Sequence, residues 1–442
     1  MARSLAAVSW EEFNALRELE TIPGLHPVYE DYARCVHCGL CLNHCPTYRL
    51  WHLEADSPRG RIFQMIRVEQ GDERVNASFV EHIDKCLDCR ACETACPSGV
   101  EYGKLVEYAR ARIERDYKRP FVSRVARSFA YRKLLPHPRR IAFFARVLRF
   151  YQRSGMQTLV RKLGLLRALG LAKREALLPK IDEQFFFRHL GTTFPASGER
   201  RARVAFFGGC VAQVTFSTLN EATIRVLTAN GCEVVVPAKQ VCCGALASHA
   251  GVREAARELA RTNLQAFASG DFDAIVTNAA GCGSTLKEYS HLFTADEPEY
   301  AAAKQFESRV QDVTEFLASL VMVAPLKQNS SRVTYQDSCH LLHGQKVREA
   351  PRALLRAIPG LELVELPYSD ICCGSAGVYN ITQTEASLEL LAEKMKHAAS
   401  TKAAMIVTAN PGCLLQMRAG AALHKTGQQV LHVMELLDRS LE

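Results

Sequence analysis

The sequence predicts a multidomain protein with α+β and α/β parts: a helical cysteine-rich module, a basic helical connector and two duplicated α/β domains. Three observations lead to this prediction. Two runs of four cysteines lie near the N-terminus, an arginine-rich segment follows them, and cysteine markers then recur at a nearly constant displacement. We place the four segments at residues 1–115, 116–200, 201–325 and 326–442.

The length and composition fit a globular chain of several domains. At 442 residues, the chain exceeds what one core usually supports. Hydrophobic residues make up 48% and charged residues 23%, a balance that excludes a disordered or fibrous protein. The cysteines number seventeen, and the start shows no apolar signal-peptide core. With no apolar run of about 18 residues, we expect a cytoplasmic protein whose clustered cysteines bind metal.

The two N-terminal cysteine runs share the spacing C-x₂-C-x₂-C-x₃-C-P. They are Cys35, Cys38, Cys41 and Cys45, followed by Pro46, and Cys86, Cys89, Cys92 and Cys96, followed by Pro97. This spacing turns several thiolates of one loop toward a common point and is typical of [4Fe–4S] clusters. Structural zinc is the alternative, although zinc sites generally show separated C-x₂-C pairs. We predict two [4Fe–4S] clusters that form an electron-transfer path.

The module resembles two-cluster bacterial ferredoxins, in which the fourth cysteine of each run ligates the other cluster. The resemblance implies two ligand sets: Cys35, Cys38, Cys41 and Cys96 for one cluster, and Cys86, Cys89, Cys92 and Cys45 for the other. Arg59 and Arg61 begin a predicted helix between the runs. They can offset the negative charge of the clusters, and a solvated helix start is the alternative.

The connector is strongly basic. Between Lys118 and Lys180 it holds seventeen Lys and Arg residues and one acidic residue, Glu175, an excess of 16 positive charges; the chain as a whole carries +8, so the rest carries −8. Five residues are predicted to form one apolar stripe, with arginines on the other helix face: Phe143, Phe144, Val147, Leu148 and Tyr151. Such a helix can lie on an anionic membrane, dock an acidic partner or pack on its own domain. Nucleic acid is not expected, because no recognised binding motif accompanies the charge.

The remaining cysteines mark an internal duplication. The first set is Cys210, Cys242, Cys243 and Cys282, and the second is Cys339, Cys372, Cys373 and Cys413. Equivalent cysteines are 129, 130 or 131 residues apart, which indicates a repeat. In each half, extended apolar runs alternate with helical stretches in a β-α-β-α-β order. This order predicts a mainly parallel sheet with the cysteines just past the strand ends.

Both halves resemble the cysteine-rich CCG domains of the heterodisulfide-reductase-type family, and the order of the parts is similar to that of glycolate oxidase iron–sulfur subunits. The motifs that carry the resemblance are CVHCGLC…CPTYRL, SPRGRI, CLDCRACETACPSGVEY, QVCCGALASHAG, NAAGCG, CHLLHGQ and CCGSAGVYNI. Related subunits of lactate-utilisation and glycerol-3-phosphate dehydrogenase complexes share this architecture.

The two halves depart from the full CCG pattern, which ends in C-x-x-C and can hold a non-cubane iron–sulfur cluster. Ala279 and Asn410 stand three residues before the last cysteine of each half. An additional iron–sulfur cluster, zinc and unliganded thiols therefore all stay open for these domains. His340, next to Cys339, is either a fifth ligand or a structural histidine, and Cys232 is expected in the core.

The resemblance implies an electron-transfer subunit, without catalytic residues of its own, of an oxidoreductase complex. FAD-containing partner subunits would oxidise glycolate or a similar 2-hydroxy acid. This chain would pass the electrons toward a membrane acceptor such as quinone, from the cytoplasm or from the inner face of the cell membrane. The alternatives are a heterodisulfide-reductase-like enzyme that acts at the CCG cysteines, a docking scaffold, and the equivalent subunit of a lactate or glycerol-3-phosphate complex.

Overall fold

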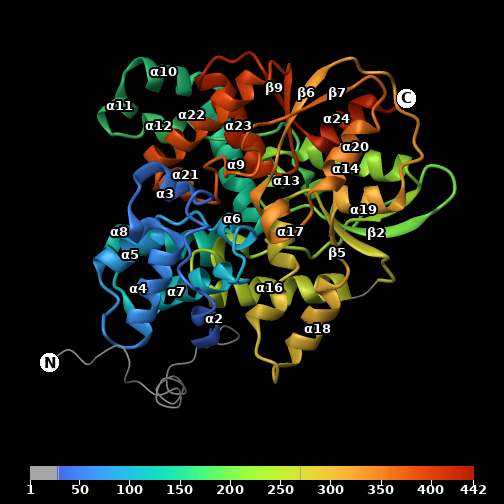
Figure 1. Ribbon diagram of the computed structural model, residues 1–442. Coiled ribbons are helices and arrows are strands. Elements are labelled where there is room, and N and C mark those ends of the chain that lie inside the picture. Colours follow the sequence, from blue (N-terminus) through green and yellow to red (C-terminus); the bar gives the residue numbers. More distant parts are fainter. Residues whose placement is uncertain (1–26, 28, 269) are drawn as a thin grey trace.

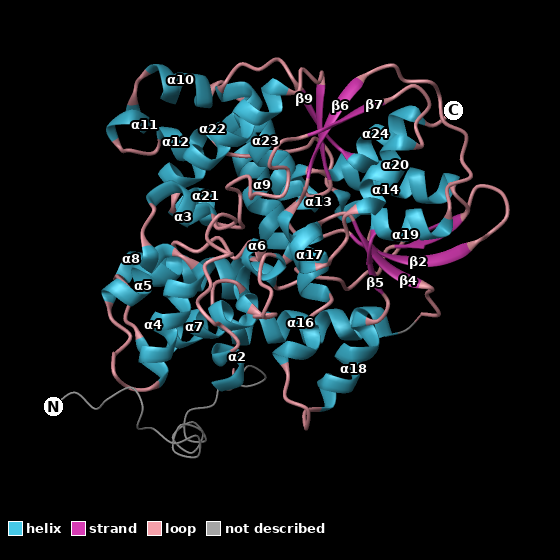
Figure 2. Ribbon diagram, viewed as in Figure 1, coloured by secondary structure: helices cyan, strands magenta, loops and turns pink. Residues whose placement is uncertain are grey.

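A computed structural model describes residues 27, 29–268 and 270–442. The expectation about a signal peptide falls on residues 1–26, which lie outside the described residues. Figure 1 shows the N-terminal module beside the first α/β half, with the second half above them. The last connector helices, which span residues 156–176, lie at the upper left. Figure 2 shows that the described strands form two separate sheets, each bordered by helices.

The N-terminal module consists of short helices around a core between α4, α5 and α7. Its elements are α2 (Tyr29–Ala33), α3 (Pro46–Trp51), η1 (Glu54–Asp56), α4 (Pro58–Glu69), α5 (Ala77–Asp84), α6 (Ala91–Thr94) and α7 (Tyr102–Asp116). Pro46 starts α3, a position where its missing N–H is not needed. Gly60 lies in the first turn of α4, where a Cβ atom would stand 1.9 Å from the Glu54 carbonyl oxygen. The glycine therefore lets α4 start directly against η1.

The connector packs one side of its longest helix, α9, on the first α/β half. Its elements are α8 (Phe121–Ser128), the π-helical turn η2 (Phe129–Leu134), α9 (Pro138–Arg153), α10 (Met156–Lys162), α11 (Leu165–Ala168) and α12 (Ala172–Ala176). Ile141 and Ala145 are buried, and Leu148 packs beside them. The predicted five-residue stripe is divided between core and surface, because Leu148 faces the core while Phe143 and Val147 are 59% and 52% exposed. No described helix is long and apolar enough to cross a bilayer.

The first α/β half contains a sheet in the order β1-β3-β2-β4-β5. The strands are β1 (Thr193–Phe194), β2 (Ala202–Phe207), β3 (Cys232–Val235), β4 (Ala274–Thr277) and β5 (Val310–Asp312). Only the short β1 is antiparallel to its neighbour; the other pairs are parallel, and Val204 of β2 pairs with Val234 and Ala274. The predicted parallel sheet is confirmed, with β5 as an additional parallel strand.

The second half repeats this topology in a sheet of order β7-β6-β8-β9. The strands are β6 (Arg332–Gln336), β7 (Glu362–Glu365), β8 (Met405–Thr408) and β9 (Gln429–His432), and all pairs are parallel. In both sheets the first strand of the repeat, β2 or β6, lies between the second and the third. The shared order agrees with the duplication inferred from the cysteine markers.

Helices border both sheets. The first half has η3 (Phe186–His189), α13 (Ala212–Thr215), α14 (Ser217–Ala229), α15 (Ala245–Ser248), α16 (Arg253–Ala268), α17 (Ala280–Leu286), η4 (Tyr289–Leu292), α18 (Pro298–Glu307) and α19 (Val313–Leu320). The second half has the π-helical turn η5 (His340–Gly344), α20 (Glu349–Arg356), α21 (Tyr379–Thr382), α22 (Thr384–Ser400), α23 (Pro411–Leu423) and α24 (Val433–Ser440).

The last helix of each half packs on the other half. Helix α19 lies against α20, and α24 lies against α14, where Arg225 forms an ion pair with Asp438 at 2.7 Å. Both α19 and α24 begin with a capping box that fixes their first turn. One hydrophobic core consequently runs through both halves, from Val204 and Phe206 to Tyr335 and Leu431.

Candidate iron–sulfur centre

Four thiols from both N-terminal runs line one enclosed cavity. They are Cys45, Cys86, Cys89 and Cys92, and all four are buried. Cys45 belongs to the first run and precedes α3, whereas the other three belong to the loop before α6 and to α6 itself. The fourth cysteine of the first run thus lies among the first three of the second run. We call these four residues the inner set.

The chemistry of the inner set fits a [4Fe–4S] cluster. Burial raises the pKa of Cys89 and Cys92 well above the ordinary thiol value, and the nearby sulfurs of Cys45 and Cys86 raise it further. Four adjacent buried thiolates repel one another, so they need a positively charged partner such as iron. Loading of a cluster would therefore release protons from these thiols.

The other four N-terminal cysteines form an outer set nearer the surface: Cys35, Cys38, Cys41 and Cys96. The thiols of Cys38 and Cys96 both raise the pKa of Cys35, behind the larger effect of burial. Burial and then the Cys35 thiol raise the pKa of Cys41 to about 11. Cys38 is exposed and the other three are half-buried. The outer set also fits a cluster, and its loop faces solvent.

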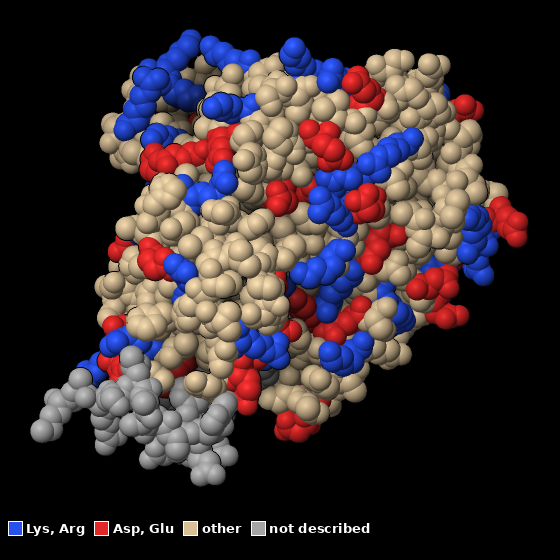
Figure 3. All heavy atoms as spheres, in the orientation of Figure 1, with Lys and Arg blue, Asp and Glu red and all other residues tan. Residues whose placement is uncertain are grey.

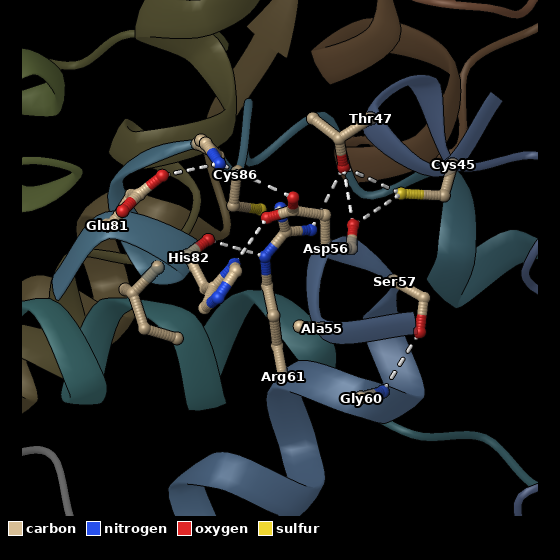
Figure 4. Close-up of polar contacts among 12 residues, drawn as sticks. Cys45, Thr47, Ala55, Asp56, Ser57, Gly60, Arg61, Glu81, His82 and Cys86 are labelled. Carbon is tan, nitrogen blue, oxygen red and sulfur yellow. Dashed lines mark hydrogen bonds and ion pairs between the residues drawn. The ribbon is translucent and has the colours of Figure 1, made fainter. Parts of the chain in front are cut away.

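Two arginines in the first turn of α4 approach different sets. Arg59 donates from Nη1 to the His37 carbonyl oxygen at 2.8 Å, within the loop of the outer set. Arg61 is 1% exposed and donates from Nη1 to the Thr47 hydroxyl at 3.1 Å, beside Cys45 (Figure 4). The solvated alternative therefore does not hold for Arg61.

Arg61 keeps its charge although it is buried. Burial alone lowers its pKa, but the nearby Cys86, Tyr102, Cys45 and Asp56 outweigh this effect and raise it. Its Nη2 lies 3.4 Å from Asp56 Oδ1, and its Nε donates to the His82 carbonyl oxygen at 2.7 Å (Figure 4). The inner set thus has a fixed positive charge beside it.

The downstream cysteines form two rows of contacting thiols. In the first row Cys210 Sγ lies 3.3 Å from Cys242 Sγ, and hydrogen bonds continue to Cys243 and Cys282. The second row repeats the first: Cys339, Cys372, Cys373 and Cys413. Both rows gather beyond the carboxyl ends of parallel strands, which meet at one edge of a sheet.

A glycine turns the chain after each cysteine pair. Gly244 and Gly374 have φ values of +88° and +86°. A Cβ atom on Gly374 would lie 2.6 Å from the Ser387 carbonyl oxygen, so a side chain there meets backbone.

The two rows differ where the C-x-x-C cysteine is missing. Asn410 donates from Nδ2 to Cys413 Sγ at 3.5 Å, and its Oδ1 accepts a hydrogen bond from the Gly281 amide at 3.3 Å. Ala279, the equivalent residue of the first half, has a side chain that cannot make either bond. Asn410 therefore joins the two rows across the boundary between the halves.

Sequence reasoning missed a buried polar cluster between the N-terminal module and the first half. His249 Nδ1 lies 2.7 Å from Glu107 Oε1 and 3.1 Å from Asp88 Oδ2. Burial alone lowers the pKa of His249, but the two carboxylates raise it to about 9, so the ring is charged at neutral pH. The three residues can ligate a metal, but the imidazolium and Arg110, 3.6 Å from Asp88, already supply positive charge. No spacing rule marks residues from three distant segments.

His340 bridges the inner-set loop and the second half. Its Nε2 lies 2.9 Å from the Asp88 carbonyl oxygen, and its ring packs edge-on against His249 at 5.1 Å. Burial, followed by the charges of His249 and Arg90, lowers the pKa of His340 to about 4, so the neutral ring donates to Asp88. This contact gives His340 a structural role. Cys232 is buried in β3, as expected.

The inner set and the second row are direct neighbours. Cys89 and Cys372 pack in one buried cluster with Leu87 and Tyr379, and Cys339 lies against it. The Cys372 thiol, after burial, is the largest contributor that raises the pKa of Cys89. The sulfur sites therefore follow one another from the exposed outer set to the inner set, the second row and, across Asn410, the first row.

Models of three protein families match four segments of the chain. A 4Fe-4S dicluster domain matches residues 31–100, and the cysteine-rich CCG domain matches residues 204–287 and 333–418. The linker region of the glycolate oxidase iron-sulfur subunit matches residues 122–178. The matches support iron–sulfur binding and the duplication, and they place a family-specific segment in the connector.

Curated relatives cover most of the chain. A probable glycolate oxidase iron-sulfur subunit of Bacillus subtilis is 42% identical over 411 residues, which cover 91% of this chain and 92% of that protein. The glycolate oxidase iron-sulfur subunit of Escherichia coli is 34% identical over 416 residues, with 92% and 94% covered. Lactate utilization protein A of Oceanobacillus iheyensis is 33% identical over 243 residues, which cover 54% of this chain. The chain therefore belongs to the family of glycolate oxidase iron-sulfur subunits.

Proposed function

We propose that this chain carries electrons within a complex that oxidises glycolate or a similar 2-hydroxy acid on the flavin of a partner subunit. Glycolate is the proposed substrate because the relatives in Bacillus subtilis and Escherichia coli are named glycolate oxidase iron-sulfur subunits. The equivalent role in lactate oxidation stays an alternative, because a lactate utilization protein is also similar.

The outer set would hold one [4Fe–4S] cluster and the inner set another, with Cys45 and Cys96 exchanged between the runs. Such clusters, when bound, accept and release one electron at a time. The protein contributes the thiolate ligands, the charge of Arg61 and a buried environment for the inner set. The arrangement of neighbouring sets carries the proposal: Cys89 of the inner set lies in the same buried cluster as Cys372 of the second row, close enough for the Cys372 thiol to raise its pKa.

Electrons would enter at the outer set, because it contains Cys38, the one exposed cysteine among the described residues. Beside the exposed Cys38, Val36 and Leu40 are 67% and 58% exposed and offer an apolar contact for the flavoprotein. If the two downstream rows also hold clusters, they would receive the electrons next. The four thiols of each row are then the proposed ligands.

Reduction of the purified complex by its substrate tests the proposal. The complex is prepared anaerobically and glycolate, lactate or glycerol 3-phosphate is added while visible absorption and low-temperature paramagnetic resonance are recorded. We expect bleaching of the iron–sulfur absorption with glycolate. Clusters that stay oxidised while the flavin turns over would exclude the electron-transfer role.

Iron and acid-labile sulfide analysis of the same preparation counts the clusters. Two cubane clusters require about eight irons per chain. A larger count would place inorganic clusters in the downstream rows, whereas zinc without sulfide would overturn the assignment of the N-terminal sets.

A further inference from the structure

The connector carries an exposed apolar surface that its own domain does not cover. Eight of its side chains on α8, η2 and α9 are between 44% and 77% exposed: Phe121, Val122, Val125, Phe129, Phe143, Phe144, Val147 and Phe150. We call them the connector face. The rings of Phe129 and Phe144 touch edge-on at 5.6 Å and join the part on α8 and η2 to the part on α9.

The connector face is bordered by arginines. On α9, Phe143, Val147 and Phe150 follow one another at helical spacing and point away from the buried Ile141 and Ala145. Arg139, Arg146 and Arg153 run along one flank of this stripe at a spacing of seven, and Arg140 lies on the other flank. The helix therefore presents an apolar centre between two basic edges.

The exposed charge of residues 118–180, the main part of the connector, is positive throughout. The one acidic residue of this stretch, Glu175, is buried and pairs with Arg161 at 2.9 Å, so none of the described acidic side chains of residues 118–180 faces solvent. Figure 3 shows Lys and Arg side chains gathered over α10–α12 at the upper left, whereas both signs mix over the rest of that view.

Beside α9 the positive charge continues into a cavity of about 1140 Å³. Six cationic side chains line it: Arg139, Arg140, Arg146, Arg149, Arg188 and Lys239. The single acidic residue in its wall, Glu183, is paired with Arg153. Anionic groups are therefore attracted to the flank of the same helix that exposes the apolar stripe.

We propose that the connector face docks this protein on the anionic surface of a lipid bilayer. A bilayer supplies apolar chains for the Phe and Val side chains and a plane of negative headgroups for the flanking arginines. An acidic protein partner would have to supply a matching apolar patch as well. Helix α9, with 16 residues, is about 24 Å long and would lie along the surface without crossing it.

Vesicle binding by the iron-loaded full-length chain tests this proposal. The chain is mixed with phosphatidylcholine vesicles that contain or lack phosphatidylglycerol, and the bound fraction is measured by flotation at low and high salt. We expect binding only to the anionic vesicles, weakened by salt. A chain that ignores anionic vesicles, or binds both kinds equally, would overturn the proposal.

Two pairs of variants locate the surface. F143S/V147S/F150S should reduce binding at least about tenfold through lost apolar burial, whereas V323S/L423S, which alters exposed apolar residues elsewhere, should not. R139E/R146E should also reduce binding, and K327E/K396E is its control. Visible iron–sulfur absorption and circular dichroism identify variants that fail to fold.

The same variants separate a membrane from a protein occupant. If F143S/V147S/F150S keeps full vesicle binding, the connector face is not the docking surface. If that variant binds vesicles normally but loses the flavoprotein subunits during co-purification, the face belongs to a protein partner and the proposal is wrong.

Discussion

At the residue scale, two arginines only two positions apart approach different cysteine sets. Arg61 is buried beside Cys45 and Cys86, whereas Arg59 reaches the loop of the outer set and pairs with Glu54 at 2.6 Å. The turn of α4 that begins at Pro58 separates them, because residues two apart on a helix point in different directions.

The first prediction concerns the reduction potential of the cluster proposed for the inner set, here called the inner cluster; the one proposed for the outer set is the outer cluster. Arg61→Gln removes a positive charge from its surroundings and should make its potential more negative, because reduction adds negative charge. A unit charge about 8 Å away at an effective dielectric constant of about 20 contributes ~2 kcal/mol, or about 90 mV for one electron. A redox titration followed by paramagnetic resonance measures the shift.

Arg59→Gln is the matched control, since it should shift the outer cluster more than the inner one. Arg61→Lys, which retains the charge, should stay closer to the wild type than Arg61→Gln. Equal shifts of both clusters in both Gln variants would contradict the separate placement.

The second prediction concerns His432, the N-cap of α24. Its Nδ1 accepts from the Met434 amide at 3.1 Å, and its Nε2 lies 3.0 Å from the Asn278 carbonyl oxygen of the other half. Burial lowers its pKa to about 4 from 6.5. Because the folded state favours the neutral ring, this contribution to stability is complete above pH 6.5 and is lost as the pH falls toward 4.

This contribution to the free energy of unfolding, about 3 kcal/mol when lost in full below the folded-state pKa, falls by about 2 kcal/mol between pH 7.5 and pH 5. Urea denaturation at pH 7.5 and pH 5 (about one unit above and more than one below the ordinary His value) measures it. His432→Asn keeps a capping side chain that does not titrate. The difference between wild type and variant should therefore shrink as the pH falls, and a constant difference would exclude His432 as the titrating group.

At the element scale, the third prediction follows from the proposed exchange of Cys45 and Cys96 between the runs. Cys45→Ser should abolish the inner cluster although the residue belongs to the first run, because Cys45 lies with Cys86, Cys89 and Cys92. Cys38→Ser should instead impair the outer cluster. Paramagnetic resonance of the reduced proteins distinguishes the two signals, and loss of the outer signal in Cys45→Ser would contradict the exchange.

The fourth prediction concerns helix α19, which belongs to the first half and packs on the second. Leu317 on α19 is fully buried, and α19 packs on α20 of the second half. Leu317→Ala should lower the free energy of unfolding by about 2–5 kcal/mol and speed amide exchange in both halves. Leu259→Ala on α16 is the control, because its core belongs to the first half and the connector. Amide exchange confined to the first half in both variants would show that the halves open independently.

At the scale of the whole molecule, the N-terminal module is held to the two halves by groups that belong to the sulfur sites themselves. Arg90 forms an ion pair with Glu288 at 2.5 Å, His340 bonds the Asp88 carbonyl, and Cys89 packs on Cys372. Loading of the cluster proposed for the inner set should therefore be coupled to domain contact, because the loop at residues 86–92 would serve both.

The fifth prediction is that removal of iron loosens this contact. Anaerobic treatment with a chelator should speed amide exchange of residues 86–96 and of η5, because the loop loses the ligand bonds that order it. Helices α14 and α24, which join the halves through their own hydrophobic core, should stay protected. Unchanged exchange at residues 86–96 after iron removal would show that the protein alone fixes this loop.

The sequence by itself determined the chemistry and the repeat. The spacing of the cysteines is a local property, since a C-x₂-C loop turns its thiols together wherever it stands. The constant displacement of the CCG markers predicted two equivalent parallel sheets, and both are present. The basic excess of the connector was also visible from composition alone, whereas helical spacing did not say which part of its apolar stripe faces the core.

Only the tertiary structure decided how these parts contact one another. The packing of α19 and α24 on opposite halves, the Asp88–Glu107–His249 cluster and the contact between Cys89 and Cys372 all join segments far apart in the chain. Each depends on which buried surfaces match in three dimensions. No periodicity or spacing within a segment records such a match, so the order of the sulfur sites became visible only in the folded protein.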